Sequence, residues 1–181
     1  MLYDLDDRLL IERVIQKTFD CEQALGVLFE RYSGKLAAYL KAKMNLEPHQ
    51  IDDVIQDSFI TASKSLASLN DPTKFYAWLV TIARNKMIDT IRANKKYCDI
   101  QEWFEELHDE PAAEMEASIG LEKMIAGLDP KDQEIILMKI ILDLSFSEIA
   151  EVLGIKQSAA KMRYYRALDE LKPKFEGQAD D

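Results

Sequence analysis

The residues best suited to chemistry lie between 75 and 96, and their chemistry is the binding of an anionic strand. Aromatic side chains open this segment, and steps of three, four or seven residues connect a mostly basic face made of Arg84, Asn85, Asp89, Arg92, Lys95 and Lys96. Cations can hold the phosphates of a single nucleic-acid strand while aromatic rings stack on its bases. A basic helix end that complements its own dipole is the alternative, which explains Lys95 and Lys96 better than Arg84 and Asn85.

A second set of cations lies in the last third of the chain, on a pattern typical of a helix-turn-helix. Ser145 and Glu148 predict a capping box for a helix over 146–153, and Gly154 permits the left-handed turn that ends it. Ser158 is then predicted to cap a last helix that carries Lys161, Arg163, Arg166 and Lys172. Such a helix can enter the major groove of DNA. A plain helical hairpin with a solvated basic face remains the alternative.

Acidic side chains line a third segment, the helix predicted over 50–66. Its apolar face consists of Ile51, Val54, Ile55, Phe59, Ala62 and Leu66, and the opposite face carries Asp52, Asp53, Gln56 and Asp57. These side chains are available to a protein partner. Complementation of the helix dipole is an alternative for Asp52 and Asp53, but it reaches Asp57 poorly.

The sequence offers little for catalysis or metal binding. The only cysteines are Cys21 and Cys98, with no Cys-x-x-Cys motif, and the two histidines have no ligand partners at suitable spacing. Paired carboxylates such as Glu148 and Glu151 lack a histidine at site-forming spacing. We therefore expect a binding protein that is not an enzyme, with no metal, cofactor or small-molecule substrate.

Charge is distributed unevenly along the 181 residues, whose net charge is −10. Residues 71–98 hold six bases and two acids, a net charge of +4, whereas residues 99–134 hold twelve acids and two bases, a net charge of −10. The flanking segments are nearly neutral. Because binding follows the local field, the acidic total does not argue against a nucleic-acid partner.

Helical periodicity without any strand pattern predicts an all-α fold. We expect helices over 9–16, 22–43, 50–66 and 75–94, a turn-rich loop over 68–74, and three more helices after Leu121. The acidic, proline-broken stretch predicts a linker. The expected organisation is a helical bundle over 1–96, a linker over 97–118, a helix-turn-helix bundle over 119–176 and a tail over 177–181. The sequence shows no signal peptide and no apolar run long enough to span a membrane, so we expect a cytoplasmic chain without membrane insertion.

These three segments together resemble the extracytoplasmic-function (ECF) group of sigma-70-type transcription initiation factors. IDDVIQDSFITASKSL resembles the helix that grips the clamp of RNA polymerase, and FYAWLVTIARNKMIDTIR resembles the segment that melts and reads the −10 element. LDPKDQEIILMKIILDLSFSEIAEVLGIKQSAAKMRYYRALDELK resembles the −35-reading helix-turn-helix. The resemblance covers about residues 9–96 and 119–172, in matching order and spacing.

The resemblance implies roles for the residues noted above. Asn85 would contact an unstacked −10 base, the loop with Lys74 would form its pocket, Asp89 would hold neighbouring side chains in place, and the phosphates would be held by Arg84, Lys86, Arg92, Lys95 and Lys96. The −35 surface would comprise Lys156, Ser158, Lys161, Met162, Arg163, Tyr165 and Arg166. Asp52, Asp53, Gln56 and Asp57 would meet core RNA polymerase. The resemblance also implies promoter DNA and an anti-sigma factor as partners, and a linker that threads through the polymerase cleft. An ordinary solvated linker is the alternative, because charge alone does not distinguish the two.

Two departures from the family pattern keep a second interpretation open. Ala159 and Ala160 stand where the family often has Thr-Val, and Met162 stands where a small polar residue is frequent. A sigma mimic that binds an anti-sigma factor without touching DNA would tolerate such changes. The basic face that includes Arg84, Asn85 and Arg92 argues against this mimic, because a decoy has no use for it.

Overall fold

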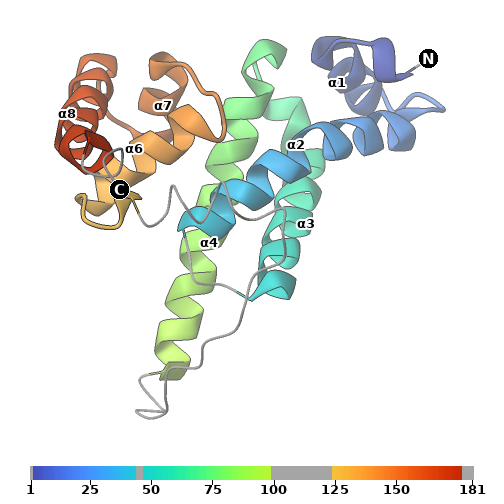
Figure 1. Ribbon diagram of the computed structural model, residues 1–181. Coiled ribbons are helices and arrows are strands. Elements are labelled where there is room, and N and C mark those ends of the chain that lie inside the picture. The colour runs from blue at the N-terminus through green and yellow to red at the C-terminus, as the bar shows by residue number, and fades with distance from the viewer. Residues whose placement is uncertain (1, 44–46, 99–123, 177–181) are drawn as a thin grey trace.

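The computed structural model describes residues 2–43, 47–98 and 124–176, with side chains for these ranges except 95–98 and 173–176. Every regular element in these ranges is a helix, which confirms the predicted all-α fold (Figure 1). Nearly all of the predicted linker over 97–118, and the whole tail over 177–181, lie outside the described residues.

The N-terminal half consists of four α-helices with short 3₁₀ turns. The helices are α1 (Asp7–Ile15), α2 (Cys21–Lys43), α3 (Pro48–Ser65) and α4 (Phe75–Cys98), and the turns are η1 (Leu2–Asp4), η2 (Leu66–Ser68) and η3 (Pro72–Lys74). The predicted bounds of the first three helices are confirmed to within two residues. α4 continues four residues beyond the predicted end at Asn94, to Cys98.

Local hydrogen bonds explain why these helices begin where they do. The Asp6 carboxylate accepts the backbone N–H of Leu9 at 2.9 Å at the start of α1. Glu47 and Gln50 form a capping box around Pro48, whose missing N–H is harmless in the first turn of α3. The Asp71 carboxylate accepts the N–H of Thr73 at 3.0 Å and fixes the turn that leads into α4.

The C-terminal half contains α6 (Pro130–Ile140), α7 (Phe146–Leu153) and α8 (Gln157–Glu176). The predicted caps at Asp129 and Ser145 are confirmed, and Gly154 adopts the expected left-handed conformation with φ 64° and ψ 36°. The predicted cap at Ser158 is wrong. α8 begins one residue earlier, because the turn after Gly154 is short and the first helical N–H groups bond to the carbonyl of Lys156.

The two halves share one continuous hydrophobic core. All six predicted apolar residues of the α3 helix and the 3₁₀ turn after it are buried. α4 packs on α3, and the C-terminal half joins this assembly through α6 against α2 and α7 against α4. Figure 1 shows the first turns of α4 beside the C-terminal half and its last turns extending away from it. Among the described residues, the C-terminal half therefore covers the start of α4 and does not reach its last turns.

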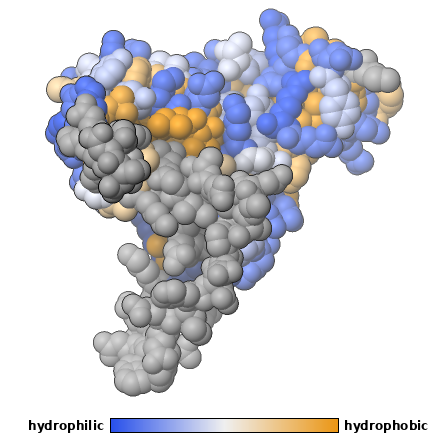
Figure 2. Space-filling model, in the orientation of Figure 1, coloured by the Kyte–Doolittle hydropathy of each residue, from blue (hydrophilic) through white to orange (hydrophobic). Residues whose placement is uncertain are grey.

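The surface is largely polar on the face shown in Figure 2, with apolar areas over α6 and near α1. The large exposed apolar side chains include Ile140 on α6 and Leu9 and Ile15 on α1. None of the described helices combines the length and the apolar composition that crossing a bilayer requires.

Candidate nucleic-acid interface

The polar face of α4 lies opposite a buried face that includes Leu79, Ala83 and Met87. Asn85 and Arg92 are exposed on the polar face. Arg92 pairs with Asp89 at 3.7 Å, the contact expected for Asp89, and both side chains are exposed. Lys86 is half-buried, and the side chains of Lys95 and Lys96 lie outside the described ones.

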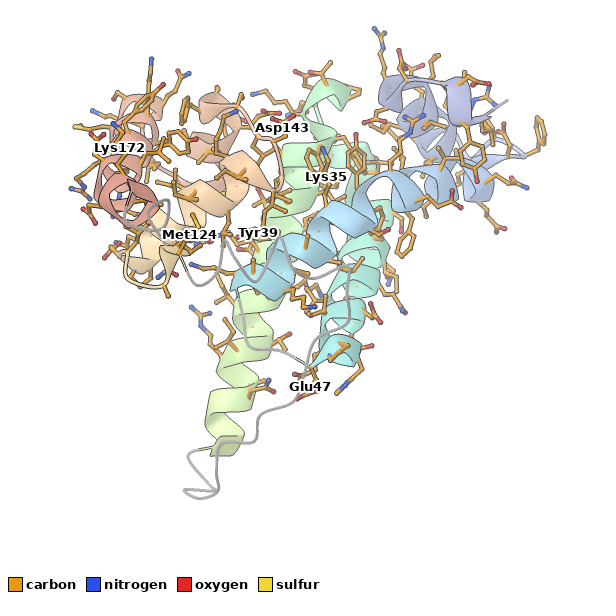
Figure 3. All side chains as sticks on the ribbon, viewed as in Figure 1. Lys35, Tyr39, Glu47, Met124, Asp143 and Lys172 are labelled. Carbon is orange, nitrogen blue, oxygen red and sulfur yellow. The ribbon has the colours of Figure 1, made fainter. Side chains whose placement is uncertain are left out.

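Arg84 faces the C-terminal half instead of solvent. Its Nε donates to Oε1 of Glu134 at 2.7 Å, and its Nη2 donates to Oε2 at 3.3 Å. The Tyr39 hydroxyl, at the end of α2 that approaches α6 (Figure 3), donates to the same Oε1 at 3.1 Å. The hydrogen bond to Glu134 raises the pKa of Arg84, while burial and then the charge of Glu134 raise the pKa of Tyr39. Side chains from α2 and α4 therefore meet at one carboxylate of α6.

The loop before α4 borders a small pocket of about 160 Å³. Its lining comprises Leu69, Lys74, Ala77, Trp78, Thr81 and Glu151. Lys74 Nζ lies 2.6 Å from Oε1 of Glu151 on α7, and this hydrogen bond raises the pKa of Lys74. Trp78 is half-buried and packs against Phe75 with a centroid separation of 6.2 Å. A pocket therefore lies beside the loop that was predicted to bind a base, and one of its walls comes from the C-terminal half.

The predicted base-reading side chains of α8 are exposed. Lys161, Met162 and Tyr165 project from the helix surface, with Met162 70 % exposed, and Lys156 and Ser158 are also exposed. On the inner side, Ala160 is fully buried. Phe146 of α7 contacts the rings of Tyr164 and Tyr165 at centroid distances of 5.3 and 6.2 Å, and these contacts orient the helix.

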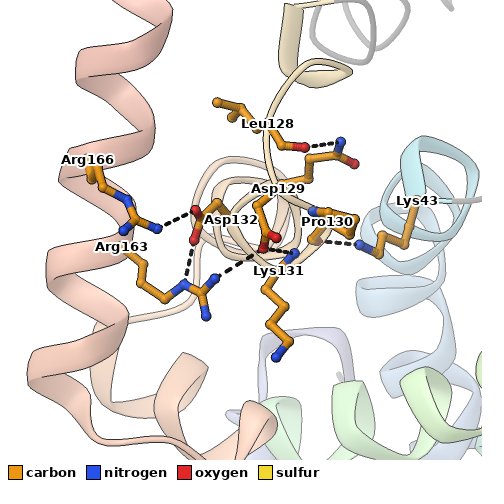
Figure 4. A network of polar contacts seen from close by, with 9 residues as sticks. Lys43, Leu128, Asp129, Pro130, Lys131, Asp132, Arg163 and Arg166 are labelled. Carbon is orange, nitrogen blue, oxygen red and sulfur yellow. Dashed lines mark hydrogen bonds and ion pairs between the residues drawn. The ribbon is translucent and has the colours of Figure 1, made fainter.

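The two arginines of α8 are held by a buried carboxylate of α6 (Figure 4). Oδ1 of Asp132 accepts from Arg163 Nε at 2.5 Å, and Oδ2 accepts from Arg166 Nη2 at 2.8 Å. Arg163 also reaches Asp129 at 3.1 Å. Burial acts to raise the pKa of Asp132, but the two arginine hydrogen bonds outweigh it and the pKa lies below its ordinary value.

Sequence reasoning missed both Asp132 and Glu134 as partners of the basic residues. The available signal was two acids among the apolar residues of α6, at positions that the helical pattern buries. Carboxylates are rarely buried without a cation. This signal predicts a cationic partner without identifying which arginine it is.

The predicted polymerase-binding side chains are all exposed on α3: Asp52, Asp53, Gln56 and Asp57. Gln56 also lines a mostly apolar pocket of about 410 Å³ between α2 and α3, together with Leu25, Phe29, Phe59 and Ile60. Phe29 and Ile60 remain partly exposed although both are large and apolar. An apolar pocket beside an acidic face suits a helix with an apolar ridge and basic flanks.

Among the described residues, no group of three or more histidine, cysteine or acidic side chains is arranged to hold a metal ion. Several cations of the interface are instead paired with carboxylates: Lys74, Arg84, Arg92, Arg163 and Arg166.

Known proteins are similar to this chain in sequence and in fold. A family model for Sigma-70 region 2 matches residues 28–97, and one for Sigma-70 region 4 matches residues 118–171. The ferric citrate uptake sigma factor FecI of Escherichia coli is 30 % identical over 151 residues, which cover 78 % of this chain and 85 % of FecI. The chain belongs to the sigma-70 family, in its ECF group.

Two further relatives support this assignment. The ECF RNA polymerase sigma factor SigW of Bacillus subtilis is 27 % identical over 181 residues, covering 92 % of this sigma factor and 96 % of SigW. The structure of CnrH in complex with the cytosolic domain of CnrY superimposes with a TM-score of 0.70 at 27 % identity, covering 97 % of this chain and 99 % of that one. The basic face of α4 falls within the region 2 match, and the exposed residues Lys161, Met162 and Tyr165 of α8 fall within the region 4 match. Each candidate surface therefore belongs to one region of the sigma factor.

Proposed function

We propose that this sigma factor reads the −10 element with α4 and its preceding loop and the −35 element with α8, while core RNA polymerase is bound in part by α3. The observation that carries the proposal is the exposure of Asn85 and Arg92 in region 2 and of Lys161, Met162 and Tyr165 in region 4. Base-contacting side chains must be accessible, whereas phosphate contacts fix the register of the protein on DNA.

At the −10 element, Asn85 would contact an extruded base and Arg92 a phosphate of the same strand. The pocket beside Trp78 is next to the loop that the family uses for such a base. Unstacking a base costs roughly a few kcal/mol per step, so capture of the extruded base is how binding would drive duplex opening. The sigma factor itself would catalyse nothing, and the polymerase would supply the chemistry.

At the −35 element, the exposed side chains of α8 would contact base edges in the major groove. Arg166 is 60 % exposed although it bonds to Asp132, so it keeps donors for a phosphate. Ala159 and Ala160 stand where the family often has larger residues, and the methyl group of Ala160 is fully enclosed. These positions would give the sigma factor a −35 preference of its own.

The acidic face of α3 and the apolar pocket beside it would form the polymerase-binding surface. Asp53→Lys with Asp57→Lys should weaken binding to core polymerase by about tenfold or more, because complementary charge becomes repulsive. The neutral variant, Asp53→Asn with Asp57→Asn, should show a smaller loss. Binding is measured with labelled sigma factor titrated with core polymerase, and circular dichroism checks the fold. Unchanged affinity in the lysine variant would remove these acids from the interface.

An anti-sigma factor is the further partner that we propose, in the cytoplasm where the polymerase works. CnrH, which shares this fold, was solved with the cytosolic domain of another protein bound to it. A sigma mimic that only captures such a partner is the second candidate, and the alanines at 159 and 160 favour it. The exposed basic residues of α4 favour the sigma factor.

In vitro transcription separates these two candidates. Purified chain and core polymerase are incubated with a template library whose −35 and −10 elements are randomised, and the transcripts are sequenced. Start sites that require both the added chain and specific promoter sequences are the expected result, and Asn85→Ala should change the preference at one −10 position. If no start site depends on the chain while it still binds polymerase, the mimic replaces the proposal.

A further inference from the structure

The two halves of the chain meet along a surface that uses residues proposed to bind the −10 strand. We define the seam as the contact of α2, α4 and the loop before α4 with α6 and α7. Lys74 and Arg84 are both proposed to bind promoter DNA, and both pair across the seam, with Glu151 and Glu134. Lys43 of α2 adds a hydrogen bond from its Nζ to the carbonyl oxygen of Pro130 at 2.9 Å.

Glu134 binds Arg84 in the way that a DNA phosphate would. The guanidinium donates two hydrogen bonds to two oxygens of one anionic group, the forked geometry that arginine offers equally to carboxylate and phosphate. The side chain of Glu134 is only 8 % exposed and that of Arg84 25 % exposed. While this pair exists, a nucleic-acid phosphate cannot accept hydrogen bonds from the same N–H groups of the guanidinium.

We propose that, in the free chain, the C-terminal half covers part of the −10-binding surface, with Glu134 standing in for a phosphate on Arg84. Binding of the single strand then requires the seam to open. This inference rests on the proposed function, because it assigns a competitor to that same surface. Asn85 and Arg92 stay exposed in the closed arrangement, so closure weakens strand binding without abolishing it.

Several features of the seam favour reversible opening. The hydroxyl of Tyr76 on α4 is buried with no hydrogen-bond partner among the described residues, and opening would return it to water. Burial lowers the pKa of Lys43, which means that the closed arrangement disfavours the charged form of this side chain. A pocket of about 170 Å³, lined by Arg84, Glu134 and Leu153 among others, leaves part of the contact between the halves unfilled.

The apparent affinity for a strand falls in proportion to the fraction of molecules that are open. A variant that weakens the seam should therefore bind the strand more tightly as a free chain. Its advantage should disappear in the polymerase holoenzyme, where both DNA-binding surfaces must already be available.

Glu134→Gln tests the proposal because it keeps the shape of the side chain and removes the charge. Binding is measured by fluorescence anisotropy with a labelled single-stranded DNA of randomised sequence, since phosphate contacts are independent of sequence. The variant should bind about tenfold more tightly than the wild type and have a larger radius of gyration in X-ray scattering. Tyr39→Phe, which removes only the hydroxyl from the same carboxylate, should change both values in the same direction by less. Circular dichroism verifies that each variant is folded.

Glu12→Gln is the matched control, because it removes the same charge at an exposed ion pair with Arg8 on α1, outside the seam. It should alter strand affinity less than twofold. An equal gain from both variants would show a general charge effect and overturn the proposal. Unchanged affinity of folded Glu134→Gln and Tyr39→Phe would overturn it as well, as would expansion without a gain in affinity.

The holoenzyme comparison separates this proposal from the proposed function. On a promoter obtained from the transcription experiment, wild-type and Glu134→Gln holoenzymes should bind equally, and a tenfold gain there would place Glu134 directly against DNA and overturn closure. If the transcription experiment yields no promoter, the proposed function fails, and the scattering and single-strand measurements still decide whether the seam closes over the basic face.

Discussion

Asp132 and Glu134 lie two residues apart on α6, yet they act on different parts of the molecule. Two residues correspond to about 200° of helical rotation, so the side chains leave the helix on opposite sides. Asp132 holds Arg163 and Arg166 of α8, within the C-terminal half. Glu134 holds Arg84 of α4 and Tyr39 of α2, across the seam.

Asp132 and Glu134 are both buried carboxylates with arginine partners. The different effects expected from losing them therefore come from where their partners lie in the chain. The partners of Asp132 are 31 and 34 residues away and belong to the same small helical unit. Those of Glu134 are 50 and 95 residues away and belong to another unit. Losing Asp132 should therefore destabilise the helix-turn-helix, whereas losing Glu134 should chiefly release one half from the other.

The largest effect is expected for Asp132→Ala. Removing the carboxylate leaves Arg163 with only the exposed Asp129 as a counterion. The expected cost is about 3 kcal/mol in the free energy of unfolding, the low end for a buried pair because Arg163 keeps Asp129 and Arg166 is well exposed. For a chain of this size, the midpoint of thermal unfolding should fall by roughly 6–12 °C. Circular dichroism measures it, with Asp169→Ala at an exposed pair as the control. A shift no larger than that of the control would show that the network contributes nothing to stability.

The pH dependence of the same contact provides a second test. The folded-state pKa of Asp132 lies below its ordinary value, so its stabilisation is complete above about pH 4 and is lost as the pH falls through the folded-state pKa. The difference in unfolding free energy between wild type and Asp132→Asn should be constant from pH 7 to 5 and shrink below pH 4. Urea titrations at each pH measure it. A difference that already shrinks between pH 7 and 5 would mean that burial, and not the arginines, controls this carboxyl.

The helices could be predicted because their signals are local. Asp129 with Pro130, Ser145 with Glu148, and Gly154 each determine a helix end through neighbours a few residues away. The exposed acids of α3 were equally predictable, since a strongly amphipathic helix fixes which face is buried. Ser158 failed as a cap because the length of the turn, and not the identity of the residue, determines where α8 begins.

The direction of the arginines could not be predicted from the sequence. Arg84 and Arg92 are eight residues apart on one helix, yet Arg84 meets Glu134 while Arg92 is exposed beside Asp89. Helical periodicity gives the same face to both, and only the position of the C-terminal half along α4 distinguishes them. That position depends on contacts between residues far apart in the sequence, which no local pattern encodes.

The smallest effect is expected at the other ion pair of the seam. Lys74 and Glu151 are 51 % and 48 % exposed, so water screens their attraction and fixing two long side chains offsets most of it. Glu151→Gln should move the midpoint of thermal unfolding by no more than about 1 °C, and raising the salt concentration should erase even that shift. Glu134→Gln, measured in parallel, should give a larger shift that persists in salt, because its pair is buried. Equal and equally salt-sensitive shifts would mean that burial does not distinguish the two contacts, and that the seam is held by surface charge along its whole length.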